Sequence, residues 1–252
     1  EVVLQDNYRP TWTATLQTLT YLLQMMPSQM ELPEIVESLI KLRIHVADDD
    51  SSRQAIEEAV SSLVQGVGIE AFWGWIRWAD VKSNVKSKKK EIAGVVSISR
   101  AWLLPVLKSA SMAVQPLQPH LAFFQQEMLG LARKCDAFAV AHPSEAAFHR
   151  ARVADLWSLF PCFAMHPADL QATFPNLSQT LVRAMSDVRY PQLVSIICGG
   201  LKTLATGIFD RRSINDEGEV EADILAELTT KLLPALFKLV ETLNGTLSEV
   251  TN

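Results

Sequence analysis

Cysteine is scarce in this sequence, and the three cysteines that occur are widely separated. Cys135, Cys162 and Cys198 predict no disulfide framework, and so few cysteines suit a reducing compartment. The chain also lacks a signal-peptide pattern and any apolar run of about 18 residues that would span a membrane, so we expect no membrane association. Because the first residue is Glu1 rather than methionine, we expect the chain to be a piece of a longer protein.

The sequence has no surplus of basic residues. Its 23 lysines and arginines are outnumbered by 28 aspartates and glutamates, which leaves a formal net charge of −5. This balance argues against a generic binder of nucleic acids, although a local basic patch can still contact phosphates. Because 48% of the residues are hydrophobic and 20% are charged, the composition is that of a globular chain and not of a disordered one.

Motifs for catalysis, cofactors and metals are absent as well. Gly66-Val-Gly68 follows a helical pattern rather than a strand, so it lacks the context of a dinucleotide-binding turn. There is no phosphate-binding P-loop and no Gly-x-Ser-x-Gly elbow. Cys162 and His166 are four residues apart, whereas zinc sites use tighter pairs such as Cys-x-x-Cys. We therefore predict a protein that is not an enzyme, with no catalytic residues, metal, cofactor or small-molecule substrate.

Apolar residues recur with the period of a helix along nearly the whole chain, and no stretch alternates as a strand does. The clearest stripe lies between Ile56 and Val67, and Gly66 and Gly68 end it. A second long helix is predicted from Leu121 to Phe138 and should end at His142. The members of the first stripe are Ile56, Ala59, Val60, Leu63, Val64 and Val67.

Prolines and polar residues mark the expected helix ends. Pro161 is predicted to stop one helix after Phe160, and the segment 176–179 (Asn-Leu-Ser-Gln) reads as a capping box that starts another. Ser99 is predicted to cap a helix whose apolar face carries Trp102, Leu103, Val106 and Leu107, and Pro105 should kink or end it. Gly199 and Gly200 lie within a later apolar stripe and should permit close approach of another helix.

The predicted helices restart at regular intervals. New pairs begin near Pro10, Ser52, Ser99, Ser144 and Pro191, at spacings of roughly 40 to 47 residues, which is the period of HEAT-type helical hairpins. Hairpins that are apolar on both broad faces are covered only by stacking on their neighbours. We therefore predict an all-α fold, a HEAT-like α-solenoid of stacked antiparallel helix pairs, with a compact all-α bundle as the alternative. Its parts are 1–81 (N-terminal helical repeats), 82–98 (a lysine-rich loop or linker) and 99–252 (C-terminal repeats of the same continuous solenoid).

Two short segments are candidates for binding. The segment 82–90 carries five lysines and no acid, and such a run forms a solvated loop, a phosphate-contacting segment or a nuclear-import signal. Arg100 follows it and is predicted to lie off the apolar stripe, where a partner can reach it. The candidate RNA-binding residues are Lys82, Lys86, Lys88, Lys89, Lys90 and Arg100.

The segment 72–78 (Phe-Trp-Gly-Trp-Ile-Arg-Trp) concentrates aromatic residues. On a helix these rings would occupy more than one face, so burial between neighbouring helix pairs is one interpretation. The other is an exposed aromatic anchor beside an arginine, the residue types that dominate binding hot spots. The candidate protein-contact residues are Trp73, Trp75, Arg77 and Trp78.

Several stretches resemble a known family. Residues 99–108 (Ser-Arg-Ala-Trp-Leu-Leu-Pro-Val-Leu-Lys) are similar to the signature of the ribosomal RNA-processing protein 12 family of HEAT-repeat proteins. Residues 156–163 resemble its Leu-Trp-x-Leu-Leu-Pro-x-Phe element, and 166–170 resemble its following Pro-x-Asp turn. Residues 39–43 and 67–70 stand where that family has comparable hairpins, and the resemblance covers about residues 8–243. The aromatic segment 72–78 departs from the family, which tends to carry a Leu-Pro-Leu-type segment there.

The resemblance implies a non-enzymatic scaffold of small-subunit ribosome biogenesis. Such a protein is expected in the nucleolus and nucleus, where it binds pre-ribosomal RNA and assembly factors within a large particle and supports rRNA processing and pre-ribosome export. The alternative is an importin-like transport adaptor that binds protein cargo with the same solenoid architecture. Ran or transport receptors are further partners that these two hypotheses leave open.

Overall fold

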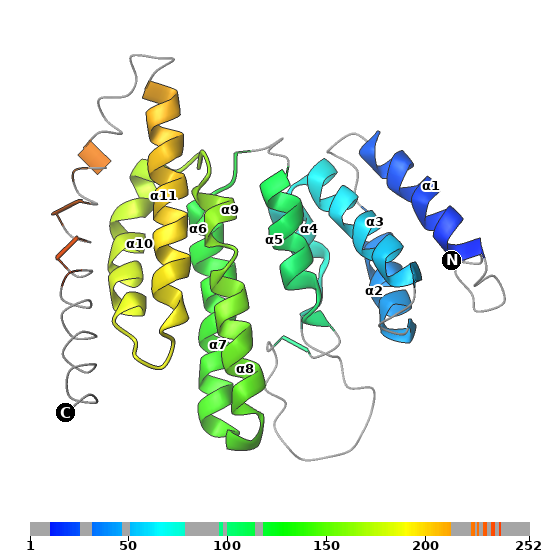
Figure 1. Ribbon diagram of the computed structural model, residues 1–252, viewed down its shortest axis with the longest axis horizontal. Helices are drawn as coiled ribbons and strands as arrows, with labels where there is room; N and C mark the ends of the chain where they lie inside the picture. The colour runs from blue at the N-terminus through cyan, green and yellow to red at the C-terminus, as the bar shows by residue number, and fades with distance from the viewer. Residues whose placement is uncertain are drawn as a thin grey trace, which may run out of the picture. The chain divides into compact units, whose positions relative to one another are not determined.

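The computed structural model describes residues 11–25, 32–46, 51–78, 96–97, 100–113 and 118–212, and a few positions between 223 and 237. Every regular element in these ranges is a helix and none is a strand, which confirms the predicted all-α fold (Figure 1). The chain forms two compact units, residues 1–117 and 118–252. Apart from Val96 and Ser97, the segment 82–98 lies outside the described residues, so its role as a linker stays a prediction.

In the first unit, α3 is the central helix. It packs against each of the four other helices, and all six residues of its predicted apolar stripe are buried. Gly68 ends α3 with a φ of 84°, a left-handed conformation that glycine adopts without a steric penalty. The helices of this unit are α1 (Trp12–Gln24), α2 (Pro33–His45), α3 (Ser51–Val67), α4 (Ile69–Trp75) and α5 (Leu103–Ala113).

The second unit is built on an antiparallel pair of helices, α7 and α8, which lie side by side in Figure 1. A π-helical turn, η4, joins α6 to α7, so the long helix predicted from Leu121 is confirmed and ends at Ala141. The helix α11 packs against α8, α9 and α10. The elements are α6 (Leu121–Phe123), η4 (Phe124–Met128), α7 (Leu129–Ala141), η5 (Pro143–Glu145), α8 (Ala146–Trp157), α9 (Phe160–Ala164), α10 (Leu170–Met185) and α11 (Gln192–Arg212).

Three prolines lie within helices, and two of them, Pro105 and Pro161, were predicted to kink or end a helix. Pro105 is the third residue of α5 and Pro161 the second of α9, where backbone N–H groups have no partner inside the helix. Both prolines therefore begin helices instead of ending them. Pro175 lies inside α10, so the capping box predicted at 176–179 is wrong. The proline is exposed while Phe174 and Leu177 beside it are fully buried, and this burial holds α10 together across the missing hydrogen bond.

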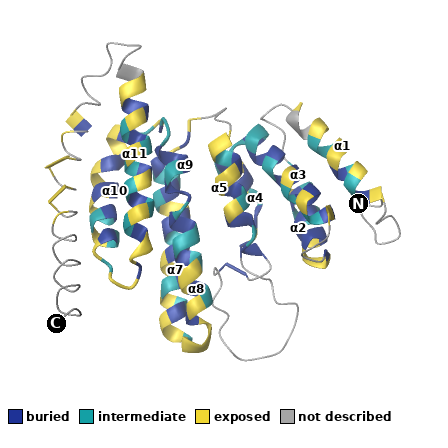
Figure 2. Cartoon of the chain, viewed as in Figure 1, coloured by how far each residue is buried: buried dark blue, intermediate teal, exposed yellow. Residues whose placement is uncertain are grey.

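An aromatic cluster forms the core of the second unit. The ring of Phe124 lies 6.0 Å from Trp157, 5.4 Å from Phe160 and 5.6 Å from Phe163, measured between centroids. All four side chains are buried. Figure 2 shows that the helices of this unit carry buried, intermediate and exposed residues along their length.

Asp169 joins the start of α10 to the start of α6. Its Oδ1 accepts the backbone N–H of Leu121 at 2.7 Å, and its Oδ2 accepts that of Ala122 at 2.9 Å. The hydroxyl of Thr173 donates to the same Oδ2 at 2.8 Å. The carboxylate therefore caps a helix that begins 48 residues earlier, where the positive end of the helix dipole favours an anion.

Gly200 of α11 packs directly against the ring of Phe160 on α9. A Cβ added at Gly200 would lie 2.1 Å from a ring carbon of Phe160, whereas one at Gly199 would meet nothing within 4 Å. The prediction that this glycine pair permits close helix packing is confirmed for Gly200.

The helix α11 corrects one expectation about membranes. By length and composition alone, its stretch Gln192–Asp210 is long and apolar enough to cross a membrane, whereas the sequence analysis expected no run of this kind. A helix that contacts three neighbours carries apolar residues around much of its circumference, which accounts for this composition.

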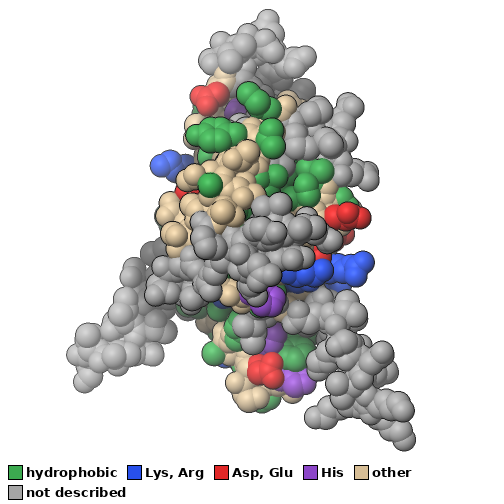
Figure 3. Space-filling view, turned by 90° about the vertical axis from the view of Figure 1, so that its right-hand side faces the viewer, with side chains coloured by type: hydrophobic (Ala, Val, Ile, Leu, Met, Phe, Trp, Pro, Cys, Tyr) green, Lys and Arg blue, Asp and Glu red, His purple; other side chains and the backbone are tan. Residues whose placement is uncertain are grey.

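The outer side of α1 is apolar and exposed. Tyr21, Leu22 and Met25 are 71%, 57% and 86% accessible to solvent. Figure 3, which looks onto α1, shows hydrophobic side chains at this surface.

We expect Asp169→Ala to lower the free energy of unfolding by about 2–3 kcal/mol, because two N–H groups at the start of α6 lose a charged acceptor. Asp169→Asn should cost about 1 kcal/mol, since its amide keeps one acceptor oxygen. Urea unfolding measures both variants, with Glu127→Ala, an exposed carboxylate on η4, as the control at under about 0.5 kcal/mol. Equal stability of Asp169→Ala and the control would contradict the capping role.

Replacing each of the two neighbouring glycines by alanine should change the free energy of unfolding in opposite directions. Gly199→Ala should raise the free energy of unfolding by up to about 1 kcal/mol, because alanine favours a helix interior. Gly200→Ala should lower it by about 1–3 kcal/mol, because the methyl group displaces Phe160. Thermal unfolding of the two variants side by side provides the measurement, and a rise for both would contradict the close packing of α9 on α11.

Candidate functional site

The predicted RNA-binding lysines lie outside the part of the chain that the structure describes. Lys82, Lys86, Lys88, Lys89 and Lys90 all fall in the segment 79–95. Their contact with RNA stays a prediction.

Arg100 is buried, and its predicted exposure is wrong. The residue is 8% accessible, and its guanidinium donates to the carbonyl oxygen of Arg77 and, at 3.3 Å, to Oε1 of Glu37 on α2. The side chain therefore links α2 to the segment that follows α4. Since these contacts hold the guanidinium inside the first unit, it does not offer the open surface predicted for a partner.

The aromatic segment after α3 divides into interior and surface residues. Trp73 and Trp78 are 4% and 8% accessible, and their rings pack together with centroids 4.2 Å apart. Trp75 is half-buried and Arg77 is exposed. Burial is therefore the correct interpretation for Trp73 and Trp78, while Trp75 and Arg77 remain accessible to a partner.

Trp75 and Arg77 line an open groove along α2. Its volume is about 500 Å³, and the α2 side supplies both acidic and basic groups. Glu37, one of these acids, already binds Arg100, so the groove holds a mixed set of charges instead of a single-sign patch. The remaining lining residues are Pro33, Glu34, Ser38 and Lys41.

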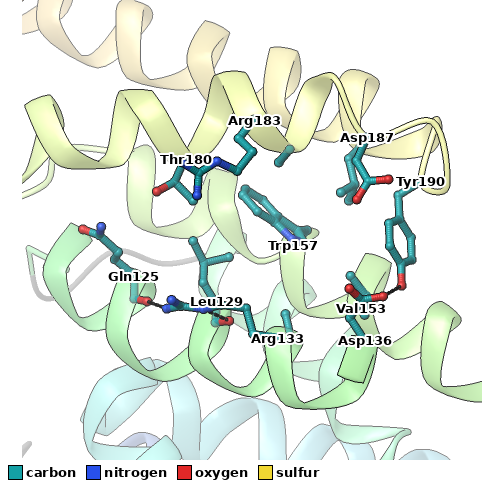
Figure 4. Close-up of a pocket in the computed structure, with 13 residues that line it drawn as sticks. Gln125, Leu129, Arg133, Asp136, Val153, Trp157, Thr180, Arg183, Asp187 and Tyr190 are labelled. Atoms are coloured by element: carbon teal, nitrogen blue, oxygen red, sulfur yellow. Dashed lines mark hydrogen bonds between the residues drawn. The ribbon is translucent and has the colours of Figure 1, made fainter. Parts of the chain in front are cut away.

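A second hollow lies in the second unit, between α7, α8, α10 and the turn before α11 (Figure 4). We call it the α7–α10 cavity, and its volume is about 230 Å³. Its apolar lining comes from four different elements and includes the buried ring of Trp157. The apolar members are Leu129, Ala132, Val153, Trp157, Ala184 and Leu193, and the polar members are Gln125, Arg133, Asp136, Thr180, Arg183, Asp187 and Tyr190.

One end of the α7–α10 cavity is closed by a cluster of charges. Asp136 on α7 accepts two hydrogen bonds from the guanidinium of Arg189, at 3.0 and 3.1 Å, and a third from the Tyr190 hydroxyl at 2.5 Å. Arg189 also donates to Asp187 at 2.7 Å. One arginine thus serves two carboxylates and fastens the α10–α11 turn to α7.

These contacts shift the ionisation of the cluster in known directions. Hydrogen bonds from Arg189 lower the pKa of Asp187, because they favour the charged carboxylate. Burial, together with the hydrogen bond to Asp136, raises the pKa of the Tyr190 hydroxyl, so this group stays a neutral donor at physiological pH. Arg189 and Asp187 therefore form a charged pair, and the neutral Tyr190 hydroxyl donates to Asp136 beside them.

The opposite end of the cavity carries two arginines. Arg133 donates from Nε to the carbonyl oxygen of Leu129 at 3.1 Å, and from its terminal nitrogen to that of Gln125 at 3.4 Å. Arg183 lies across from it in the last turn of α10. Both side chains are exposed, and Figure 4 shows them on facing sides of the cavity.

The α7–α10 cavity could not be predicted from the sequence. Its lining residues come from positions 125 to 193, and no local pattern connects them. The dense charge at Asp187 and Arg189, next to Tyr190 and Pro191, was the one local feature that pointed to an ordered turn.

Cys162 and His166 belong to no cluster of metal-ligating side chains within the described ranges. Cys162 is buried in α9, and no group of three or more metal-ligating side chains occurs among the residues described. His166 has a positive φ of 54° and forms the turn that leads to Asp169.

Comparisons with known proteins agree on one family. A family model described as "Ribosomal RNA-processing protein 12, HEAT repeats" matches residues 1–243. An RRP12-like protein of Homo sapiens is 24% identical over 245 residues, which are 94% of this chain and 17% of that protein. An RRP12-like protein of Gallus gallus is 25% identical over 210 residues, or 80% of this chain and 15% of its own length.

A third relative extends the same finding to insects. An RRP12-like protein of Drosophila melanogaster is 28% identical over 141 residues, which are 54% of this chain and 9% of that protein. The chain thus spans less than a fifth of the length of each of these relatives. Because the family model matches nearly the whole chain and every described element is helical, this chain belongs to the ribosomal RNA-processing protein 12 family and represents its HEAT-repeat α-solenoid.

Proposed function

We propose that this chain is a non-enzymatic scaffold of small-subunit ribosome biogenesis that binds pre-ribosomal RNA and assembly proteins. The observation that carries the proposal is the match of residues 1–243 to the HEAT repeats of ribosomal RNA-processing protein 12, a family named for its part in ribosomal RNA processing. The same membership supports a location in the nucleolus and nucleus. In this role the protein supports rRNA processing and pre-ribosome export.

The geometry of the described helices suits such a scaffold. Helical hairpins present long surfaces on which many modest contacts add up, without a deep enclosed site. The groove beside Trp75 and Arg77 and the α7–α10 cavity are both open to solvent and both lined by charged and apolar groups, as protein contact sites are. We assign Trp75 and Arg77 to protein contact.

The lysine-rich segment is the proposed contact for RNA. Five lysines within 82–90 concentrate positive charge in a chain that is otherwise acidic. Each lysine–phosphate contact releases a bound counterion, so such binding weakens as the salt concentration rises. The proposed contact therefore has a salt signature that distinguishes it from an apolar protein contact.

Cross-linking in cells tests the proposed function directly. The full-length protein is cross-linked to RNA, purified under denaturing conditions, and the attached RNA is sequenced. We expect enrichment of small-subunit precursor RNA over RNA recovered with an unrelated nuclear protein. Background recovery of that RNA, together with native co-purification of transport cargo in a Ran-GTP-dependent manner, would favour the importin-like alternative.

Replacing four of the lysines tests the RNA contact. The variant Lys86→Gln/Lys88→Gln/Lys89→Gln/Lys90→Gln should bind a single-stranded precursor-rRNA fragment more weakly, and its slope of log K against log salt should flatten by roughly 0.7 per lost phosphate contact. The control changes the exposed lysines Lys41, Lys108, Lys134 and Lys202 to glutamine, which removes the same charge from the helices. Equal affinities and equal slopes for the two variants would exclude the lysine-rich segment from RNA binding.

A further inference from the structure

The α7–α10 cavity has features that specify a class of partner. We propose that it is a docking site for a short extended peptide of another protein that carries a large apolar side chain next to an aspartate or glutamate. The apolar side chain enters the cavity against Trp157, and the neighbouring carboxylate binds Arg133 and Arg183. This inference rests on the proposed function, since it names the kind of assembly protein that the scaffold holds at this site.

The size and lining of the cavity fit one side chain. A volume of about 230 Å³ accommodates a leucine, methionine or phenylalanine side chain, but it is small for a folded element. Six of its lining residues are apolar, and they come from α7, α8, α10 and α11. Removing an apolar side chain of this size from water supplies the main favourable term of short-peptide binding.

Two guanidinium groups at the mouth of the cavity are available to an anion. Among the residues that the structure describes, Arg133 is bound only to the carbonyl oxygens of Gln125 and Leu129, and Arg183 has no carboxylate partner. A guanidinium has five N–H donors, so Arg133 keeps three for a ligand after these two bonds. The backbone contacts also hold Arg133 in place, which reduces the entropy lost when a ligand binds.

The acids of the cavity do not compete for these arginines. Asp136 is occupied by Arg189 and Tyr190, and Asp187 is occupied by Arg189. With Arg189 included, three arginines face two carboxylates, so the mouth beside Arg133 and Arg183 keeps positive charge in a chain whose net charge is −5. Charge complementarity therefore favours an acidic occupant at that end.

The same features favour a peptide over RNA. Trp157 is only 6% accessible, so the ring area that it exposes in the cavity suffices for contact with one apolar side chain and not for stacking a base. Asp136 and Asp187 line the other end of the cavity, where Arg189 already pairs with them, so positive charge is left only at the end beside Arg133 and Arg183. A peptide can place a single carboxylate there, whereas a phosphate backbone carries a charge at every nucleotide along the cavity. Arginine binds a carboxylate through two parallel hydrogen bonds, which fixes the direction of the peptide.

Selection from a display library of random short peptides tests the proposal with the full-length protein. We expect enriched peptides to share a large apolar residue flanked by aspartate or glutamate. A labelled copy of the most enriched peptide should bind the Arg133→Glu/Arg183→Glu variant at least roughly tenfold more weakly, because the charge reversal repels its carboxylate. The control Lys134→Glu/Lys202→Glu makes the same change in net charge at exposed positions outside the cavity and should bind as the wild type does.

A variant without a charge change separates docking from general electrostatics. Ala184→Leu fills the cavity from α10 and should also weaken peptide binding by roughly tenfold or more, since the apolar side chain of the peptide can no longer enter the cavity. Circular dichroism and thermal unfolding establish that each variant is folded before its affinity is compared. Peptide binding that survives in both folded variants would overturn the proposal.

Other occupants give different results, and each would overturn the proposal. Selection of peptides without acidic residues would remove the role of Arg133 and Arg183. Binding of a labelled single-stranded RNA that is lost in Arg133→Glu/Arg183→Glu, with no peptide enriched, would make the cavity an RNA site. Self-association of the wild type that Ala184→Leu abolishes would make the occupant a second copy of the chain.

The proposed function can be judged separately from this site. If the full-length protein cross-links to small-subunit precursor RNA in cells but no peptide is selected, the scaffold role stands and the peptide site fails. If peptides are selected and precursor RNA stays at background, the peptide site stands and the scaffold role fails.

Discussion

The carboxylate of Asp169 is the interaction on which the second unit depends. It lies where α10 begins, yet it satisfies the first backbone N–H groups of α6, so two helix starts that are far apart in sequence share one anion. The N–H of Ala168 also donates to the carbonyl of Pro119 at 3.0 Å, which adds a backbone bond to the same junction. With that junction fixed, the helix that begins at α6 and the helix α10 have a defined register. The α7–α10 cavity lies between these two helices, so the positions of its lining residues depend on that junction.

In the first unit, helices are linked by ion pairs between side chains instead of by a shared capping carboxylate. Arg43 on α2 is 8% accessible and donates to Glu57 on α3 at 3.2 Å, while its guanidinium lies 5.3 Å from the ring of Trp102. Arg100 makes the second link, to Glu37. Each pair joins a buried arginine to a glutamate that stays partly exposed, so its net contribution to stability is small. The two pairs link α2 to α3 and α2 to the segment before α5.

Sequence reasoning predicted the helices better than their ends, and the reason is physical. The stripe from Ile56 to Val67 was predicted residue by residue because helical periodicity is a local property. The capping box predicted at 176–179 was wrong because α10 continues through Pro175. Burial of Phe174 and Leu177 outweighs one lost backbone bond, and this burial depends on neighbouring helices. The prediction for Arg100 was wrong for a related reason. Its place off the apolar stripe predicted an exposed side chain, but Glu37, distant in sequence, and the carbonyl oxygen of Arg77 accept its hydrogen bonds inside the unit.

The same long-range pairing decides which charges remain for function. Arg189 in the second unit binds both Asp136 and Asp187, and these ion pairs hold the α10–α11 turn on α7. Arg133 and Arg183 line the same cavity, where Arg133 donates to backbone carbonyls and neither arginine has a carboxylate partner among the described residues. An arginine that holds helices together and one that awaits a ligand are therefore indistinguishable in the sequence. The two kinds can be told apart only when the fold shows which acids already bind an arginine. For this reason the cavity mouth, and not the charge cluster at its far end, is the surface that can select a partner.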